Sequence, residues 1–218
     1  MTSEITAQIV AGERQGTVYP YSVIEYANYI LDNEDDYEDE VDLVKAMLVY
    51  GGYAQIYFNH NTDDLAYDYL ELADVNAVQN VTAADLAKYA YDGQSTFGDI
   101  SFTGVNIELK TKLVMNLYFK NVPENTVFKI GEQVLPVRTS GSTTIVTVDN
   151  ITAKNISSSY AFTIFVGGSQ VGSFDYSPLT YCYNVINRGV SSTRPQEMID
   201  VVKALYLYSQ QADSYIPN

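Results

Sequence analysis

The chain repeats itself over a long distance, and this repetition constrains its fold more than any other feature. Residues 42–50 recur as residues 200–208, and residues 21–26 recur as residues 176–181. The offsets are 158 and 155, so the second copy carries three extra residues between its two blocks. A fixed period is typical of units that are stacked or strung in arrays. Because this period has the length of a small domain, it favours a modular protein over a single-site enzyme.

Charge and hydropathy exclude two classes of partner. The chain has 218 residues, of which 46% are hydrophobic, so it can bury one or two real cores. Its net charge of −15 repels nucleic acid and anionic membranes. No apolar run approaches the roughly 20 residues of a membrane span, and no signal peptide opens the chain. We therefore expect no nucleic-acid partner and no membrane insertion. Strand-like sequence follows Met1-Thr2-Ser3 at once, so we also expect a piece of a longer protein.

The N-terminal part predicts a hairpin followed by helices. Residues 1–21 alternate apolar and polar side chains around a turn at Gly12–Gly16, which predicts a β-hairpin. This hairpin is either the end of an upstream repeat unit or an addition to the sheet that follows; it could also pack on its own helices. Residues 22–92 predict a helical region, beginning with Ser22 as N-cap.

Within that helical region, the helix that Ser22 caps is expected first, followed by one long helix and two short ones. The acidic run 32–40 is interpreted as a linker, and the long helix follows it from Val41 to Phe58. Shorter helices are expected over 64–72 and 82–91, the second with Thr82 as N-cap and Asp85 three residues later.

The rest of the chain changes to strands and then returns to helices. Residues 98–176 hold short runs rich in Val, Ile, Thr and aromatic residues, separated by turn signals. This spacing predicts an antiparallel β-sandwich, either Ig-like or jelly-roll-like. Residues 177–218 predict a helical pair, the second copy of the repeat. The expected class is α+β, with an α-helical bundle built from duplicated helix pairs. How the two pairs pack is left open.

Metal and nucleophile chemistry find little support in the sequence. The run 32–40 offers oxygen ligands for calcium, but its carboxylates are contiguous and no Gly permits the sharp turn of a calcium loop. His60 is the single histidine, in a polar loop, and Cys182 is the single cysteine, inside a predicted helix. These two cannot build a zinc site or a catalytic dyad. We predict no cofactor, no metal and no enzyme, although two carboxylates that meet only in space would revive a hydrolase.

The tyrosines are the remaining candidates for a binding surface. The chain has 20 Tyr and no Trp, and Tyr suits half-buried surfaces that contact sugars or proteins. Tyr50/Tyr208 and Tyr57/Tyr215 recur in both copies, which favours packing between helices or onto a sheet. Residues outside the recurring set are better candidates for an exposed, ligand-binding aromatic surface. These candidates are Tyr53, Tyr67, Tyr69, Tyr89 and Tyr91.

Two stretches carry a resemblance to a known group of proteins. Residues 43–58 and 61–66 resemble a recurrent stretch in large secreted and surface proteins of gut and rumen Firmicutes, where it follows a β module. Residues 202–212 are similar to the closing segment of those proteins. The resemblance implies a secreted or cell-surface, non-catalytic accessory module that acts on plant or host polysaccharide.

Two functions follow as hypotheses. The first is a module for carbohydrate binding and adhesion, in which exposed tyrosines stack on sugar faces. The second is a structural spacer or a protein–protein docking module of a multi-domain surface or cellulosome-type protein. The partner of the chain would be a polysaccharide under the first hypothesis and neighbouring protein modules under the second.

Overall fold

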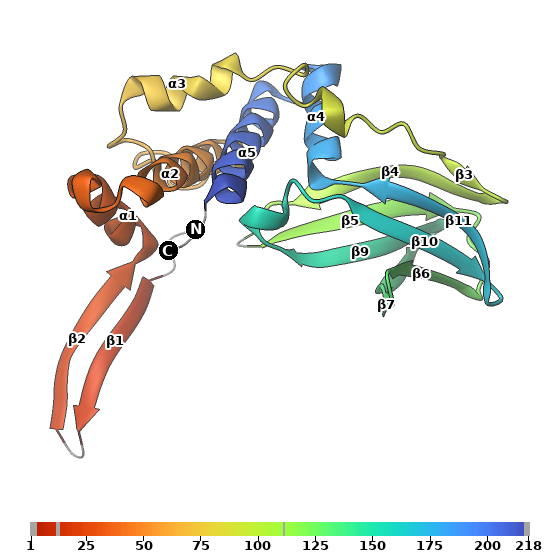
Figure 1. Cartoon of the computed structure of the whole chain (residues 1–218), viewed down its shortest axis with the longest axis horizontal. Coiled ribbons are helices and arrows are strands. Elements are labelled where there is room, and N and C mark those ends of the chain that lie inside the picture. The colour runs from red at the N-terminus through yellow and green to blue at the C-terminus, as the bar shows by residue number, and fades with distance from the viewer. Residues whose placement is uncertain (1–3, 12–13, 111, 216–218) are drawn as a thin grey trace. The chain divides into compact units, whose positions relative to one another are not determined.

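The chain combines helices with antiparallel sheets. The computed structural model describes residues 4–11, 14–110 and 112–215, and over residues 4–21 it describes the backbone. Within these ranges there are five α-helices and three antiparallel sheets of two, four and five strands (Figure 1). The expected α+β class with antiparallel sheets is confirmed. The chain divides into two compact units: a helical unit (Met1–Asn80 and Pro195–Asn218) and a two-sheet unit (Val81–Arg194).

The helical unit begins with a hairpin that leads into a capped helix. Strands β1 (Glu4–Ala11) and β2 (Arg14–Ser22) pair antiparallel, and residues 12 and 13 of the expected turn lie outside the described residues. Helix α1 (Val23–Asp32) follows. The Glu25 amide donates to Ser22 Oγ at 2.9 Å, and the Ser22 amide donates to Glu25 Oε2 at 3.2 Å. Ser22 is thus the N-cap that the sequence predicts, in a capping box.

The acidic run is more ordered than a linker. It forms a 3-10 turn, η1 (Glu34–Asp36), and then the first turn of the long helix α2 (Glu38–Phe58). Helix α2 therefore begins at Glu38 and not at Val41. Carboxylates in a first helical turn interact favourably with the helix dipole. Lys45 Nζ lies 3.2 Å from Glu34 Oε1, which joins η1 to the second turn of α2.

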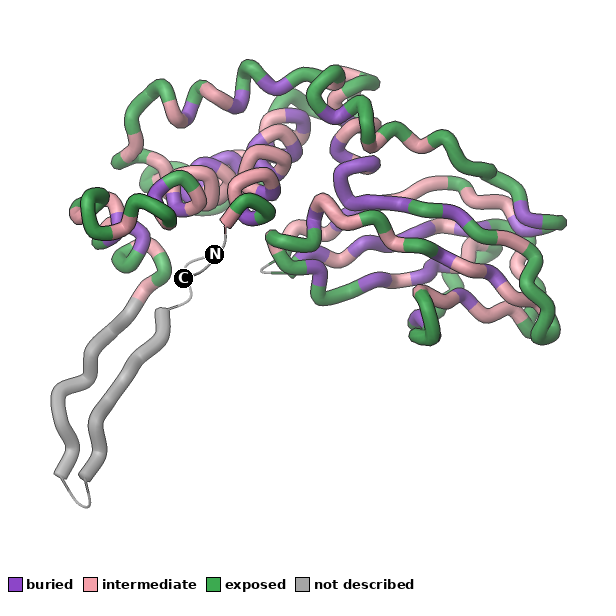
Figure 2. The backbone as a smooth tube through the Cα atoms, in the orientation of Figure 1, coloured by how far each residue is buried: buried purple, intermediate pink, exposed green. Residues whose placement is uncertain are grey.

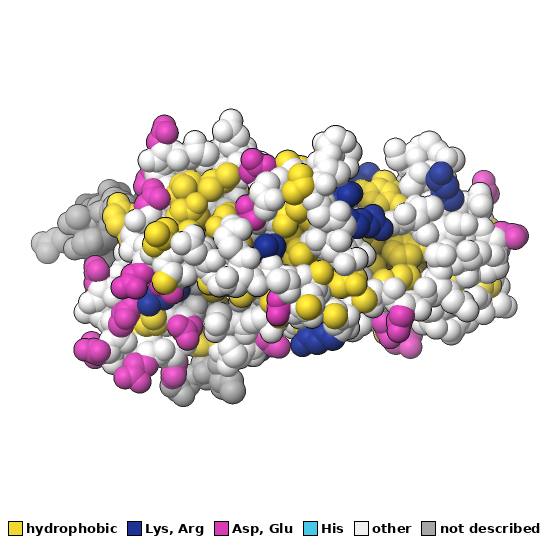
Figure 3. Space-filling model, turned by 90° about the horizontal axis from the view of Figure 1, so that it is seen from above, with side chains coloured by type: hydrophobic (Ala, Val, Ile, Leu, Met, Phe, Trp, Pro, Cys, Tyr) yellow, Lys and Arg dark blue, Asp and Glu magenta, His cyan; other side chains and the backbone are white. Residues whose placement is uncertain are grey.

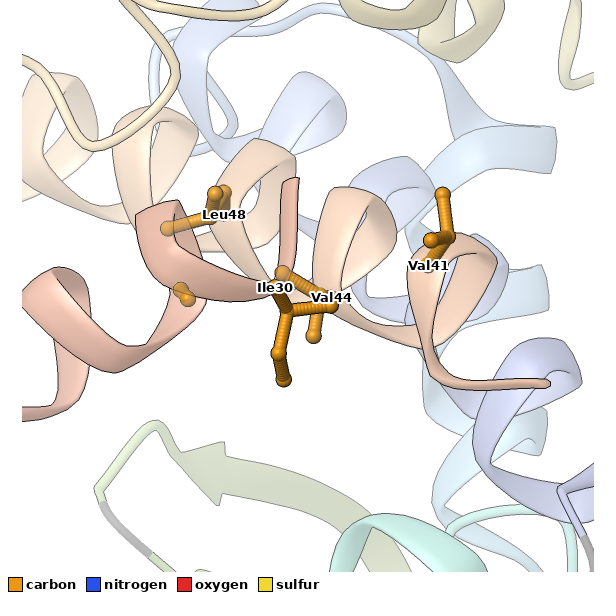
Figure 4. Close-up of a cluster of buried hydrophobic side chains, with 5 residues drawn as sticks. Ile30, Val41, Val44 and Leu48 are labelled. Carbon is orange, nitrogen blue, oxygen red and sulfur yellow. The ribbon is translucent and has the colours of Figure 1, made fainter. Parts of the chain in front are cut away.

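Helices α1 and α2 share a core of buried aliphatic side chains. Val41, Val44 and Leu48 lie on one face of α2 because they are three and four residues apart. They pack against Ala27 and Ile30 of α1. Figure 4 shows Ile30 beside Val44, with Leu48 and Val41 further along α2 on either side. Each fully buried aliphatic side chain of this kind contributes about 1.5–3 kcal/mol to folding.

The segment after α2 turns where a helix is expected. The predicted helix over 64–72 is wrong, because α3 (Leu72–Asn80) begins only at the end of that range. The Gln55 side chain explains the difference. It accepts from the Ala66 amide at 2.7 Å and donates to the carbonyls of Asn61 at 3.1 Å and Asp64 at 2.9 Å. These bonds satisfy the backbone in a non-helical path.

Helix α5 (Gln196–Ser214) returns to the helical unit and packs on α2 and α3. The rings of Tyr50 on α2 and Tyr208 on α5 stack with their centroids 5.8 Å apart and their planes 14° apart. Of the two environments expected for this recurring pair, a helix interface or a sheet, the pair therefore occupies the helix interface. The Tyr215 hydroxyl, just after α5, donates to Glu40 Oε1 at 3.3 Å.

The two-sheet unit contains a four-stranded sheet of order β11-β10-β6-β7 and a five-stranded sheet of order β3-β4-β5-β9-β8. The strands are β3 (Thr96–Phe97), β4 (Ile100–Glu108), β5 (Leu113–Lys120), β6 (Thr126–Ile130), β7 (Gln133–Val134), β8 (Val137–Ser140), β9 (Thr143–Ile151), β10 (Tyr160–Val166) and β11 (Ser169–Tyr176). A 3-10 turn, η3 (Ala153–Asn155), follows β9.

Aromatic rings join the two sheets. The ring of Phe119 on β5 lies 4.7 Å from that of Phe128 on β6, and the ring of Phe102 on β4 lies 5.2 Å from that of Phe174 on β11. Phe119 and Phe128 are fully buried. Aromatic pairs at such separations contribute about 0.5–1.5 kcal/mol beyond their burial. Figure 2 shows the buried positions (purple) along the strands of both sheets and in α2 and α5.

Helix α4 (Pro178–Arg188) belongs to the two-sheet unit, so the predicted pair over 177–218 is divided between the units. The buried face of α4 carries Leu179, Cys182 and Val185, and the helix contacts β4 and the 3-10 turn η2 (Ala87–Tyr89). The helix expected over 82–91 shrinks to η2. Its predicted cap instead closes a turn, since the Thr82 amide and hydroxyl both donate to Asp85 Oδ2 at 2.8 Å.

Candidate functional site

Tyr53 is a core residue, which corrects its place on an exposed surface. Its side chain is 9% exposed, and its hydroxyl donates to the Val75 carbonyl at 3.3 Å. Gln79 Nε2 lies 3.5 Å from the same hydroxyl. A tyrosine whose ring and hydroxyl are both engaged inside the protein cannot stack on a ligand. The sequence pattern did not show this because the partners lie 22 and 26 residues further along the chain.

Tyr67 packs against helix α2. A Cβ at Gly52 would lie 2.2 Å from Tyr67 Cδ1, so the ring covers the place where a side chain would project. The rings of Tyr67 and Tyr53 lie 5.5 Å apart. Burial raises the pKa of the Tyr67 hydroxyl, with the nearby Tyr53 as a further cause. Tyr67 is half-buried, and the face of its ring is engaged by α2.

Tyr91 and Tyr89 lie in the other unit. The Tyr91 hydroxyl donates to the Gln94 carbonyl, and its ring centroid lies 5.7 Å from those of both Phe102 and Tyr176. Burial raises the pKa of Tyr91. Tyr89 is half-buried, with Lys88 Nζ 5.0 Å from its ring centroid. Tyr91 is therefore part of the aromatic core that joins the sheets.

Tyr69 is 74% exposed, which makes it the most exposed of the three candidates in the helical unit. The five candidates divide between the units, with three in the helical unit and Tyr89 and Tyr91 in the two-sheet unit. Within the helical unit, Tyr53 is buried and the ring of Tyr67 packs on α2, so these two do not form an exposed aromatic surface with Tyr69.

A different surface carries aromatic and polar side chains together. Strand β5 alternates between two environments, as a strand with one face in a core does. Leu113, Met115, Leu117 and Phe119 are buried at 3% exposure or less, on the face toward the four-stranded sheet. The intervening residues lie on the opposite face, which we call the outward face. They are Val114, Asn116, Tyr118 and Lys120.

Hydrogen-bonded polar side chains cross the outward face in a row. Asn116 pairs in register with Asn106 on β4 and with Thr147 on β9. Asn116 Nδ2 donates to Asn106 Oδ1 at 3.2 Å, and the Thr147 hydroxyl donates to Asn116 Oδ1 at 2.8 Å. Asn116 is 2% exposed, whereas Asn106 is exposed. The buried amide in the middle therefore fixes the positions of the polar groups beside it.

The middle residue of this row also bonds to a charged pair. Asn116 Nδ2 also donates to Glu108 Oε1 at 2.8 Å, and Lys110 Nζ lies 2.6 Å from Glu108 Oε2. The hydrogen bond from Lys110 is the largest cause that lowers the pKa of Glu108, followed by the bond from Asn116. Arg138 on β8 also lowers this pKa through its charge. Glu108 is thus held ionised, with both of its oxygens engaged.

Tyr118 lies beside the polar row with space at one side. Its neighbours in register are Gly104 on β4 and Ile145 on β9, and Ile145 pairs in turn with Arg138. Gly104 has no side chain, and a Cβ built there would meet no atom within 4 Å. Tyr118 is half-buried. The outward face thus presents an aromatic ring with open space on the Gly104 side, next to the amide and hydroxyl groups of the polar row, and Arg138 lies two strands away in register.

These residues were not predicted from the sequence, although the alternation of residues 113–120 indicates them. Apolar residues occupy every second position, and Asn116, Tyr118 and Lys120 occupy the positions between them. What the sequence does not reveal is the register that brings Asn106 and Thr147 alongside Asn116, because those pairings span 10 and 31 residues.

Charge is distributed very unevenly between the units. The helical unit holds 19 acidic and 3 basic residues, a net charge of −16, and the two-sheet unit holds 8 acidic and 9 basic residues, a net charge of +1. Figure 3 shows more acidic side chains (magenta) over the helical unit than over the two-sheet unit. The strongly negative field predicted for the whole chain therefore arises from the helical unit.

Neither a metal-binding cluster nor a helix that could span a membrane occurs among the described residues. Over residues 4–11, 14–110 and 112–215, no three His, Cys, Asp or Glu side chains converge in a way that could hold a metal ion. The expectation of no cofactor, including no calcium at residues 32–40, stays a prediction. In the same part of the chain, none of the helices has the length and apolar character needed to cross a bilayer.

Comparisons with known proteins leave the chain without a shown family. No protein-family model matches it, and neither a curated protein nor a solved structure is similar enough to count as a match.

Proposed function

We propose that this chain is a non-catalytic carbohydrate-binding module that binds polysaccharide through the outward face of the five-stranded sheet. The observation that carries the proposal is the hydrogen-bonded row Asn106–Asn116–Thr147 beside the half-buried ring of Tyr118. Sugar rings offer apolar faces that stack on aromatic side chains and hydroxyls that bond to amides and charged groups. A sheet face that carries both kinds of group suits a polymer chain.

The residues of the face divide into two roles. Tyr118 supplies the stacking surface, while the exposed Asn106 and Arg138 supply hydrogen bonds to hydroxyls. Asn116 and Lys110 act through Asn106 and Glu108, because their own polar atoms are engaged within the face. Preorganised polar groups lose less entropy when they bind.

The finer architecture belongs to the same proposal. The ring contacts between Phe119 and Phe128 and between Phe102 and Phe174 support a β-sandwich whose two layers are the four- and five-stranded sheets. Such a sandwich leaves the outward face of one layer for a ligand. The resemblance to secreted accessory modules makes a cell-surface or secreted location part of this proposal.

At the outward face, the state of Glu108 argues against a role for this carboxylate as an acid catalyst. A glycosidase needs one carboxyl group whose pKa is raised, so that it can act as a general acid. The pKa of Glu108 moves the other way, because Lys110 and Asn116 both donate to it. This carboxylate therefore suits a binding or structural role.

The test is affinity electrophoresis against soluble cellulose derivatives, xyloglucan, xylan, mannan, pectin and mucin glycans. We expect at least one polymer to retard the protein, and Tyr118→Ala to abolish the retardation. Tyr69→Ala is the matched control, since it removes an equally aromatic side chain that is 74% exposed in the helical unit. Loss of binding in Tyr69→Ala with retention in Tyr118→Ala would refute the assignment of the face. Binding to none of the polymers would refute the function.

The charge of the helical unit favours the second candidate, a protein-docking module. A net charge of −16 on one unit, with +1 on the other, would steer a basic partner toward the helices. Capture by a basic partner module would weaken steeply as salt rises from 50 to 500 mM, whereas stacking on Tyr118 would change little.

A further inference from the structure

The first hairpin of the chain has the same pairing register as the last one. Each pair of β1–β2 from Ile5↔Tyr21 to Ala11↔Arg14 becomes a pair of β10–β11 when 155 is added to both residue numbers. Thus Ile5↔Tyr21 corresponds to Tyr160↔Tyr176, and Val10↔Gln15 corresponds to Phe165↔Gln170. The register shift falls at the same place in both hairpins, between Gln8 and Val10 and between Ile164 and Phe165.

The correspondence continues past the hairpins into the helices. Ser22 and Ser177, also 155 apart, are both N-caps with capping boxes, and their backbone angles agree (φ −111°, ψ 149° and φ −116°, ψ 149°). Two unrelated hairpins of equal length would not be expected to share both a register shift and a helix cap at matched positions. The two segments are therefore equivalent in backbone as well as in sequence.

The surroundings of the two hairpins differ. The second edge of β10 pairs with β6, from Phe162↔Ile130 to Val166↔Thr126, and β10–β11 buries Phe162, Ile164, Phe174 and Tyr176. In the part of the chain that the structure describes, β1 pairs with β2 alone. The residues at the four corresponding positions are nevertheless apolar or aromatic in the first hairpin. They are Ala7, Ile9, Tyr19 and Tyr21.

We infer that β1–β2 is the closing hairpin of a second two-sheet unit. The second edge of β1 pairs antiparallel with a strand equivalent to β6, which a partner supplies. That partner is a sheet unit of the same kind as residues 81–159, without a closing hairpin of its own. An unpaired strand edge with apolar residues at alternate positions is a template for such pairing. The β6 strand of this chain is already occupied by β10, so it does not fill the place.

The experiment supplies the missing partner in the same polypeptide. Residues 81–159 are joined directly to Ile5 of the full chain, because Ile5 occupies the place of Tyr160. Hydrogen exchange of the β1 amides is then compared with that in the natural chain. We expect exchange to slow by about a hundredfold or more, since the strand edge becomes part of a cooperative sheet. Equal exchange in the two proteins would overturn the inference.

A matched control separates specific closure from mere proximity. Ile9→Asp with Tyr19→Asp places charges at the positions that correspond to the buried Ile164 and Phe174. In the fused protein these changes should abolish the added protection, and in the natural chain they should leave the unfolding of both units unchanged. Protection that survives both changes would contradict closure by this hairpin.

A second variant keeps the inference testable if the fusion does not fold. Residues 160–176 of the natural chain are replaced by residues 5–21 carrying Ala7→Phe, a segment of equal length. A closing hairpin should keep the β6 amides protected in this graft, and loss of that protection would overturn the inference. Protection of β1 that rises with concentration in the natural chain, together with dimer formation, would also overturn it, because the partner would then be a second copy.

Discussion

The contact between Gly52 and Tyr67 predicts that Gly52→Ala destabilises the protein when Tyr67 is present and stabilises it when Tyr67 is absent. A Cβ at Gly52 would lie 2.2 Å from Cδ1, 2.5 Å from Cε1 and 2.8 Å from Cγ of Tyr67. These atoms lie at the base and side of the ring, so the whole ring must move to admit a methyl group. Gly52→Ala therefore tests directly whether Tyr67 packs on α2.

Two opposing effects set the magnitude. Ala is about 1 kcal/mol better than Gly in a helix interior, whereas overpacking a filled site costs about 1–3 kcal/mol. Because the clash involves three ring atoms, we take the upper end, so Gly52→Ala should lower the free energy of unfolding by about 2 kcal/mol. With Tyr67→Ala already present the clash is gone, and the same change should raise it by about 1 kcal/mol. The coupling between the two positions is then about 3 kcal/mol.

Urea unfolding of the four proteins, followed by circular dichroism, measures this cycle. The double-mutant cycle supplies its own control, because helix propensity is the same in both backgrounds. If Gly52→Ala stabilises the protein equally with and without Tyr67, the ring does not lie on α2. Tyr67 would then return as a candidate for an exposed aromatic surface.

Three further predictions concern the two-sheet unit. Asn116→Ala should lower the free energy of unfolding in urea by about 1–3 kcal/mol, because Thr147 and Glu108 lose their buried partner. Asn106→Ala should lower it by less than about 0.5 kcal/mol, and equal losses would contradict the buried role of Asn116. Burial raises the pKa of the Cys182 thiol to about 12. At pH 8 a thiol reagent should therefore label the native protein about a thousandfold more slowly than the urea-unfolded chain. Rapid labelling of the native protein would show that the core around α4 is open. The pKa of Glu108 is lowered in the fold, so its contribution is present above its ordinary value of 4.5 and is lost as pH falls through the lower folded value. Lys110→Met should flatten this acid dependence in unfolding measured from pH 6 to pH 3, by less than about 1 kcal/mol because the pair is exposed; an unchanged slope would show that Lys110 does not hold the carboxylate.

Local signals in the sequence were enough to find several elements. The Ser22 N-cap, the long helix that ends at Phe58 and the antiparallel strands over residues 98–176 each depend on neighbours a few residues apart. Helix and strand periodicity report such neighbours directly. The recurring Tyr50 and Tyr208 were expected to pack between helices or onto a sheet, and their rings stack between α2 and α5.

Other predictions failed where a distant side chain altered a local preference. The expected helix over 64–72 is replaced by turns, since Gln55 bonds to the backbone of that loop from α2. The expected exposure of Tyr53 fails because Val75 and Gln79 reach its hydroxyl from α3. Propensity within the loop or the helix carries no record of these partners.

The sequence by itself determined the α+β class, the Ser22 cap of α1, the alternation of β5 and the apolar positions of the first hairpin. Only the tertiary structure decided that α4 joins the sheets while α5 joins the helices, and that Asn106, Asn116 and Thr147 meet beside Tyr118. The physical reason is range. Periodicity and capping follow from contacts within a turn or a strand, whereas strand register and helix partners depend on which apolar faces find each other across the chain.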